Sequence, residues 1–393
     1  MRRITTEERR ARLAARHGLA PAGKADDPVG VARSLVALHA TDPATVYLST
    51  WARTSSFAPS DLERSLYEEK RLVRVLGMRR TLFVVPVELL PVVHAACTRT
   101  IAVRERRRLE GFLADSGVAR PDRWLHRASQ AALAALDELG EASTSQIAAA
   151  APLLATRLRV GAGTRFETTQ SAAARLLPQL AMEGQVVRTR PRGSWTNGKH
   201  RWSATAAWLG DVIAELEPAA AQAELARRYL AAFGPVTETD LRWWAGWTAR
   251  EARAALAATS HALVDVGGRE ALVLADDLEA VDPREPAAAL LPTLDATVMG
   301  WKERDWYLGP HAETLFDRNG NAGPTVWWDG RVVGGWAQRP DGEIVFALLD
   351  DVGSDARAGI EREAERLQTW LGDVRVRPGF LPPFQRELAG ERS

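Results

Sequence analysis

The sequence has little cysteine and no long apolar run, and each shortage excludes a class of protein. Cys97 is the only cysteine among the 393 residues, so an internal disulfide framework is impossible and a reducing cytoplasm is the expected compartment. No apolar run reaches the length of a transmembrane helix, and residues 1–7 lack the apolar stretch of a signal peptide. We therefore expect a soluble, cytoplasmic protein that does not engage a membrane.

Signatures of the common metal and cofactor enzymes are also missing. The seven histidines are scattered, and together with Cys97 they do not form the two pairs of closely spaced ligands that a zinc site needs. There is no phosphate loop, dinucleotide fingerprint or Gly-x-Ser-x-Gly elbow. We therefore expect neither a metal nor a cofactor.

Lysine is scarce, whereas arginine is abundant. Lysine and arginine together number 51, of which only four are lysine, so 47 are arginine, and the net charge is +1. Arginine makes bidentate and stacking contacts with phosphates and bases, although an arginine-rich composition is also typical of a GC-rich genome. A nearly neutral chain has to gather positive charge on one face to bind nucleic acid, so local clusters matter more than the total.

Three stretches, residues 27–85, 127–202 and 221–274, repeat one plan of helices, a polar turn, another helix and a two-stranded hairpin. This order is typical of a winged helix. The remaining residues read as a β-meander with strong hairpin signals at Asp329-Gly330 and Asp341-Gly342, then a helix over 355–371 and a last strand at 374–376.

The sequence thus predicts an α+β fold of three tandem winged-helix units followed by a β-rich C-terminal domain. A proline-rich joint at 282–286 marks the end of the third unit. The four expected domains are 1–120, 121–215, 216–285 and 286–393.

Two predicted hairpins carry positive charge suited to nucleic acid. The candidate DNA-binding residues are Arg79 and Arg80 at the first hairpin, and Arg188, Arg190, Arg192, Trp195, Lys199 and Arg201 at the second. Such cations neutralise phosphates, and an indole stacks on bases. The alternative is that the hairpin carries solvated charge, with its tryptophans packed on the domain. Because the second hairpin follows a helix-turn-helix pattern, we favour DNA contact.

The string Leu38-His39-Ala40-Thr41-Asp42-Pro43 holds the candidate catalytic residues, His39 and Thr41. The two stand at the end of a predicted helix, just before a new helix capped by Asp42 with proline at its first position. Both side chains then point into one concavity. On spacing alone, a structural histidine and a turn threonine are the commoner interpretation.

Several strings in a fixed order resemble the AlkZ/YcaQ superfamily of bacterial DNA glycosylases. They are Leu38 to Pro43 followed by Tyr47-Leu48 and Trp51-Ala52-Arg53, then 77–84, 240–246 and 290–295, and together they span almost the whole chain. The resemblance implies three winged helices in a concave scaffold, a β-rich part that grips the duplex, and excision of alkylated purines such as N7-alkylguanines, bulky adducts or cross-links.

The family's catalytic pair, Gln-x-Gln or Gln-x-Asp, falls on His39 and Thr41, so this sequence departs from the family at both side chains. Since an N7-alkylguanine is already a good leaving group, a neutral His39 that accepts a proton from water and a Thr41 that orients that water satisfy the chemistry. The resemblance leaves open which lesion is excised and whether its base is flipped out of the helix.

Three hypotheses follow. The first is a monofunctional glycosylase in base-excision repair or genotoxin resistance, without a Schiff base because no lysine lies near the motif. The second is a non-catalytic DNA-binding protein, either a transcriptional regulator or a lesion-binding factor. The third is a protein-interaction scaffold. Several winged helices within one chain predict a monomer, and damaged double-stranded DNA in the nucleoid is the expected partner.

Overall fold

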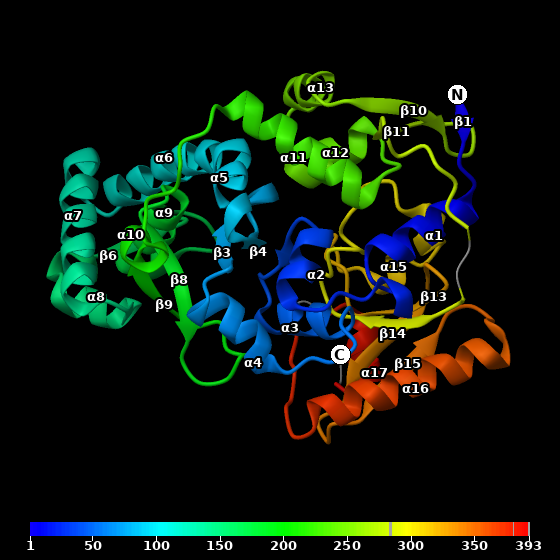
Figure 1. The fold of residues 1–393 in the computed structure, drawn as a ribbon. Helices are drawn as coiled ribbons and strands as arrows, with labels where there is room; N and C mark the ends of the chain where they lie inside the picture. The colour runs from blue at the N-terminus through cyan, green and yellow to red at the C-terminus, as the bar shows by residue number, and fades with distance from the viewer. Residues whose placement is uncertain (283–284, 380, 392–393) are drawn as a thin grey trace.

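The computed structural model describes residues 1–282, 285–379 and 381–391 and confirms a mixed α+β fold (Figure 1). Pro283 and Arg284 of the predicted proline-rich joint lie outside the described residues. The N-terminal segment comprises strand β1 (Arg2–Arg3) and helix α1 (Thr6–Arg16).

The first helix-hairpin unit places the candidate catalytic string. Its elements are α2 (Pro28–Ser34), β2 (Leu38–His39), α3 (Pro43–Trp51), α4 (Pro59–Glu63), a π-helical turn (Arg64–Glu68), β3 (Leu72–Leu76) and β4 (Leu82–Pro86). Asp42 caps α3 as expected, because its carboxylate accepts from the backbone N–H of Ala44 at 3.1 Å. Helices α5 (Leu90–Val93) and α6 (Arg99–Asp115) lead to the second unit.

The second unit differs from the expectation at one place. It comprises α7 (Pro121–Leu139), β5 (Ala142–Ser143), α8 (Thr144–Ala150), β6 (Arg157–Val160), β7 (Thr168–Ser171), α9 (Ala173–Met182), β8 (Val186–Pro191), β9 (His200–Ala204) and α10 (Thr205–Leu209). Residues 168–171 pair with residues 157–160 as an additional hairpin, whereas the expected plan has only helices and a polar turn before the final hairpin. The polar run Thr-Thr-Gln-Ser has no apolar face to bury as a helix.

The sheets of the first two units join edge to edge. Strand order in the resulting six-stranded sheet is β2-β4-β3-β8-β9-β5, and β3 meets β8 at Arg74 and Arg188. The two hairpins that carry the predicted DNA-binding cations are therefore neighbours in one sheet.

The third unit comprises α11 (Pro218–Phe233), α12 (Glu238–Ala245), α13 (Ala249–Ala257), β10 (His261–Asp265) and β11 (Glu270–Leu274). Strand β1 adds to it in parallel with β10, so the first residues of the chain complete the sheet of this unit.

The C-terminal part contains a four-stranded antiparallel sheet, β12-β13-β14-β15, with the hairpins at Asp329-Gly330 and Asp341-Gly342 confirmed. Its elements are β12 (Ala288–Leu291), α14 (Asp305–Leu308), α15 (Ala312–Leu315), β13 (Thr325–Trp328), β14 (Arg331–Gln338), β15 (Ile344–Leu348), α16 (Gly353–Leu371) and α17 (Pro383–Leu388). The predicted strand at 374–376 is wrong, because the amide of Gln338, not a neighbouring strand, bonds the backbone of Val374 and Val376.

Two main cores hold these parts together. One contiguous core runs through the first unit, the third unit and the C-terminal sheet, whereas the second unit packs around a core of its own. Figure 1 shows the same division, with α7, α8 and α9 on one side and β13–β15 with α16 on the other. The first unit lies between them, which places its strand β2 near the middle of the molecule.

Candidate active site and nucleic-acid interface

His39 lies in strand β2, so the expectation of a helix end is wrong. Helix α2 ends at Ser34, and Val36 takes a φ of 64°, which turns the chain into an extended segment. His39 then pairs with Phe83 of β4, and the N–H of Ala40 donates to the carbonyl of Leu82 at 2.8 Å. The edge of a sheet, rather than a fraying helix, holds the candidate residues.

The imidazole of His39 is buried and neutral. Its ring is 3% exposed and lies edge-on to Phe83 at a centroid distance of 5.0 Å. Burial, and then the charge of Arg79, lower the pKa of His39 to about 3, against a smaller opposing effect of Asp295. Its Nδ1 has no hydrogen-bond partner among the residues that the structure describes. A buried polar atom in that state is ready to bond a water or a substrate.

Thr41 occupies a different environment. Its side chain is exposed, and its Oγ1 accepts from the N–H of Leu82 at 3.4 Å. Asp42 beside it is buried, and its second carboxylate oxygen accepts from the N–H of Gly379 at 2.9 Å. Burial raises the pKa of Asp42 despite these bonds. Thr41 is thus exposed to solvent, whereas the next residue, Asp42, is bonded to the C-terminal part through Gly379.

A buried ion pair joins two of the four strings. Arg53 Nη2 lies 2.6 Å from Asp295 Oδ1, and both side chains are 1% exposed or less. Ser49 also donates to Asp295 at 2.6 Å. Burial raises the pKa of Asp295, but the Arg53 charge and these hydrogen bonds outweigh it and leave the pKa below its usual value. The pair holds α3 against the segment after β12, 242 residues away in the chain.

The other two strings meet through Arg79. Its guanidinium lies 4.0 Å above the ring of Trp243 in α12, and Arg304 lies over the same ring at 4.9 Å. Burial, followed by the charge of Arg304, lowers the pKa of Arg79 to about 10. Its neighbour Arg80 is exposed and pairs with Glu105 at 2.8 Å. Arg79 therefore packs against the third unit, and its charge also acts on His39. Arg80 is exposed to solvent and contacts α6 through Glu105.

The hairpin of β8 and β9, which we call the second wing, contains both anchored and free residues. Trp195 is 9% exposed and packs on Tyr47 of α3 at 4.7 Å and on Trp370 of α16 at 5.9 Å. Arg190 pairs with Glu63 at 2.6 Å and with Glu68 at 3.2 Å. These two residues fasten the wing to the first unit and to α16.

The remaining predicted cations lie along the sheet of the second unit. Arg188 stacks over Trp202 at 4.7 Å, and burial lowers its pKa to about 10. Arg201 donates to the carbonyl of Glu141. Arg192 and Lys199 are exposed, and no carboxylate pairs with either one within the described ranges.

Arg157 lies close to these predicted cations, although the sequence does not single it out. Arg157 of β6 lines the same groove as Arg188, Arg192 and Lys199, which has a volume of about 850 Å³. The available signal was the alternation Arg157-Leu158-Arg159 before two glycines, a pattern typical of a half-buried strand that enters a turn.

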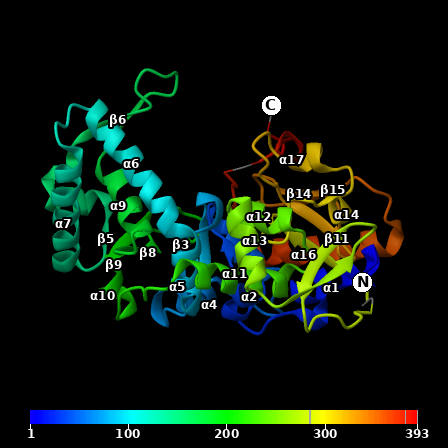
Figure 2. The same ribbon diagram turned by 90° about the horizontal axis from the view of Figure 1, so that it is seen from above.

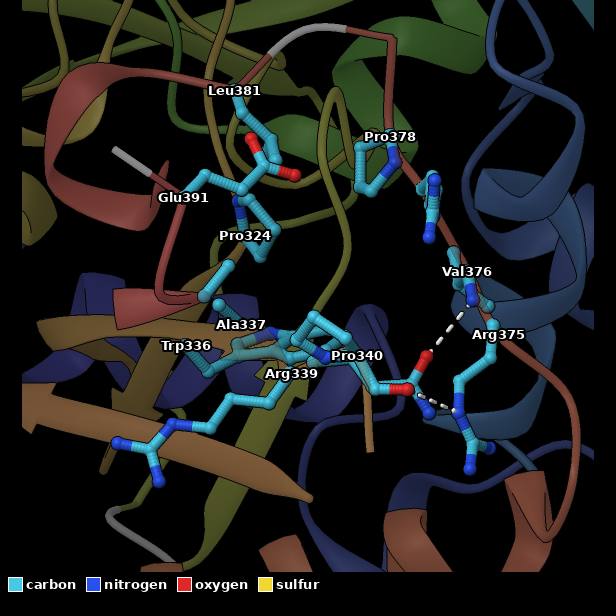
Figure 3. A pocket seen from close by; sticks show the side chains of 13 residues that line it. Pro324, Trp336, Ala337, Arg339, Pro340, Arg375, Val376, Pro378, Leu381 and Glu391 are labelled. Carbon is cyan, nitrogen blue, oxygen red and sulfur yellow. Dashed lines mark hydrogen bonds between the residues drawn. The ribbon is translucent and has the colours of Figure 1, made fainter. Parts of the chain in front are cut away.

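A separate pocket of about 280 Å³ lies in the C-terminal part (Figure 3). Pro324 and Leu381 form one side and Pro378 and Val376 the other, with Trp336 and Pro340 along the base. The residue after Pro378 is Gly379, whose N–H donates to Asp42, so one segment that lines the pocket also contacts the residue that caps α3.

The described residues contain no group of three or more His, Cys, Asp or Glu side chains arranged to hold a metal ion. None of their helices combines the length and the apolar character that crossing a bilayer demands.

Two buried neutral histidines predict a loss of stability in acid. His17 is fully buried, and burial followed by the Arg53 charge lowers its pKa to about 3, as for His39. Between pH 6.5 and pH 3 the unfolded chain binds the protons that these folded histidines reject, so stability falls as pH falls below 6.5. From pH 7 to pH 5 each histidine costs about 2 kcal/mol of unfolding free energy.

Urea unfolding at the two pH values measures this effect. His39→Gln should shrink the loss by about 2 kcal/mol. His126→Gln, at an exposed position, should leave it unchanged. Equal losses in the wild type and in His39→Gln would contradict the expectation.

Comparisons with known proteins identify a family and a similar fold. The sequence profile of the family described as DNA glycosylase AlkZ-like matches residues 32–370. Among solved structures, the Streptomyces sahachiroi DNA glycosylase AlkZ has a similar fold, with a TM-score of 0.72 and 22% identity over 93% of this chain and 97% of that chain. No curated protein matches the sequence. Because the family profile covers most of the chain, the protein belongs to the AlkZ-like family of DNA glycosylases.

Proposed function

We propose that this protein is a monofunctional DNA glycosylase that hydrolyses the N-glycosidic bond of alkylated purines, with N7-alkylguanines as the substrate class. The observation that carries the proposal is the state of His39, a buried neutral imidazole with an unpartnered Nδ1. It stands where the family resemblance places a catalytic side chain. Membership of a DNA glycosylase family supports the reaction class.

The reaction needs little acid-base assistance. The C1′–N9 bond breaks with its electron pair moving into the cationic purine, which leaves as a neutral base. A water oxygen bonds to the oxocarbenium-like C1′ and becomes strongly acidic. A histidine whose pKa is about 3 is a weak base, yet it can orient that water and pass its proton to solvent. The products are the free base, an abasic site and a proton.

The two lysines nearest to His39 and Thr41 in sequence, Lys24 and Lys70, give no support to a lyase step through a Schiff base. The amine of Lys24 donates to the carbonyl of Ala52 at 3.2 Å. The amine of Lys70 lies over the ring of Trp208 at 4.5 Å. Both are engaged away from the motif, which favours a monofunctional enzyme.

The DNA-binding scaffold in this proposal is the set of three helix-hairpin units, each read as a winged helix in a monomer. Strands β3 and β4, β8 and β9, and β10 and β11 are the three wings. Arg192 and Lys199 on the second wing are the cations best placed to meet phosphates, since both are exposed and neither forms an ion pair within the described ranges. Arg190 and Trp195 serve instead to hold the wing in place.

If Arg192 and Lys199 contact phosphates and Arg190 does not, replacing them should change the salt dependence of DNA binding differently. Arg192→Gln and Lys199→Gln should each reduce the slope of log binding constant against log salt concentration by about 0.9, the value for one phosphate contact. Arg190→Gln is the matched control, because Glu63 and Glu68 already neutralise that guanidinium. Fluorescence titrations with duplex DNA at several salt concentrations measure the slopes. Equal slopes in all three variants would contradict the assignment.

The decisive test is release of free base from duplex DNA containing N7-methylguanine. A wild-type protein that binds this DNA in a salt-dependent way but releases no base from it, or from DNA with bulkier N7 adducts, would overturn the glycosylase proposal. The second candidate function is that of a non-catalytic protein that binds lesions, and one observation favours it. The hydroxyl of Thr41 is already bonded to the backbone of Leu82, whereas the family's second catalytic position carries an amide or a carboxylate.

A further inference from the structure

The hairpin of β6 and β7 extends from the second unit beyond the end of α6 (Figure 2). Its base is fixed, because Leu158 is fully buried in the core of that unit. The N–H of Arg159 also donates to the hydroxyl of Ser116 in the chain after α6, at 2.8 Å. The seven residues of its turn, 161–167, project from this anchored base.

The turn presents an aromatic side chain to solvent. Phe166 is 69% exposed, and the guanidinium of Arg165 lies 4.6 Å above its ring. The turn is ordered by hydrogen bonds, since Glu167 accepts from the N–H of Gly163 at 2.9 Å and pairs with Arg159 at 2.9 Å. The ordered turn therefore holds an aromatic face in solvent, where it is available to stack on a partner.

The groove at the base of this hairpin is basic and free of carboxylates. Among the residues that the structure describes, its charged lining consists of Arg157 from the hairpin and of Arg188, Arg192 and Lys199 from the second wing, with no aspartate or glutamate. Within the described ranges, no ion pair neutralises Arg157 or the tip residue Arg165, although Arg159 between them is paired. The unpaired positive charge therefore follows the hairpin from its base to its tip and suits a polyanion.

We propose that this hairpin grips duplex DNA, with one phosphate backbone in the groove and Phe166 inserted as a wedge between base pairs from the minor groove. Apolar wedges of this kind unstack a base step, and the bent duplex then meets more protein surface. The part of the hairpin free to enter the groove is its turn, residues 161–167, because Leu158 is buried in the core and the N–H of Arg159 is bonded to Ser116. The inference rests on the proposed function only in taking duplex DNA as the substrate.

The test uses the full-length protein and a duplex carrying 2-aminopurine, whose fluorescence rises when the base is unstacked. Wild-type protein should raise the signal. Phe166→Ala should abolish the rise and weaken duplex binding about fivefold or more, because an aromatic stack on a base is lost. Val212→Ala, at an equally exposed position (69%) of a different loop, is the matched control and should leave both unchanged. Arg157→Gln should weaken binding and lower the salt slope by about 0.9, with the fluorescence rise at saturation retained.

Two results would overturn the wedge. One is an equal fluorescence rise and affinity in Phe166→Ala and the wild type, and the other is the absence of any rise with wild-type protein at saturation. Base release from N7-methylguanine DNA, measured in parallel, tests the glycosylase proposal separately from the wedge. A Phe166-dependent rise without base release would overturn the enzymatic function alone, whereas base release without the rise would overturn the wedge alone.

Discussion

Replacement of His39 by alanine is expected to slow the release of N7-methylguanine about 100-fold while duplex affinity is kept. Proton-transfer assistance contributes two to four orders of magnitude in general, and a base of pKa about 3 belongs at the lower end of that range. This expectation follows from the proposed mechanism, in which the imidazole of His39, a residue 3% exposed beside Phe83, orients the water that attacks C1′ and does not contact the phosphates. Single-turnover base release and duplex titration measure the two quantities separately.

His39→Gln and His126→Ala are the controls for this result. The family's catalytic pair, as the resemblance implies it, has glutamine at the position of His39. Because the glutamine amide can bond a water, His39→Gln should keep most of the rate. His126 is exposed on α7, so its alanine variant should match the wild type. The rate should also show no inflection near pH 6.5, because His39 stays neutral above its lowered pKa. Full activity in His39→Ala would remove His39 from the mechanism.

Replacement of Asp295 by alanine is expected to lower the free energy of unfolding by about 3–5 kcal/mol, because it leaves the guanidinium of Arg53 buried without its partner. The arginine cannot escape to water, since its other hydrogen bonds reach the carbonyls of His17 and Ser49 and the hydroxyl of Thr297, all within the core. Equilibrium unfolding in urea, followed by tryptophan fluorescence, gives the loss.

An exposed pair supplies the matched control. Arg33 and Glu88 lie 2.7 Å apart with side chains 52% and 41% exposed, so Glu88→Ala should cost less than about 1 kcal/mol. The double replacement Arg53→Met with Asp295→Leu should be less destabilised than Asp295→Ala, because both buried charges are removed together. If Asp295→Ala proved no worse than Glu88→Ala, the pair would not hold α3 to the C-terminal part.

Much of the local structure was predictable because it depends on short-range chemistry. The cap at Asp42-Pro43 and the hairpins at Asp329-Gly330 and Asp341-Gly342 formed as expected. The hairpin of β6 and β7 was missed because its turn has no Asn-Gly or Asp-Gly signal and its second strand is polar. The helix end expected at His39 became a strand because β4, more than forty residues later, pairs with it.

The sequence by itself determined the mixed α+β fold and the family, since the first depends on local patterns and the second on short strings that occur in a fixed order along the chain. Only the tertiary structure decided what those residues face. Trp195 is packed between α3 and α16, whereas Arg192 and Lys199 remain exposed on the same wing. The neutrality of His39 and the pairing of Arg53 with Asp295 likewise come from burial by distant segments. The reason is physical: burial and charge pairing depend on which surfaces meet in space, and a local pattern does not contain that information.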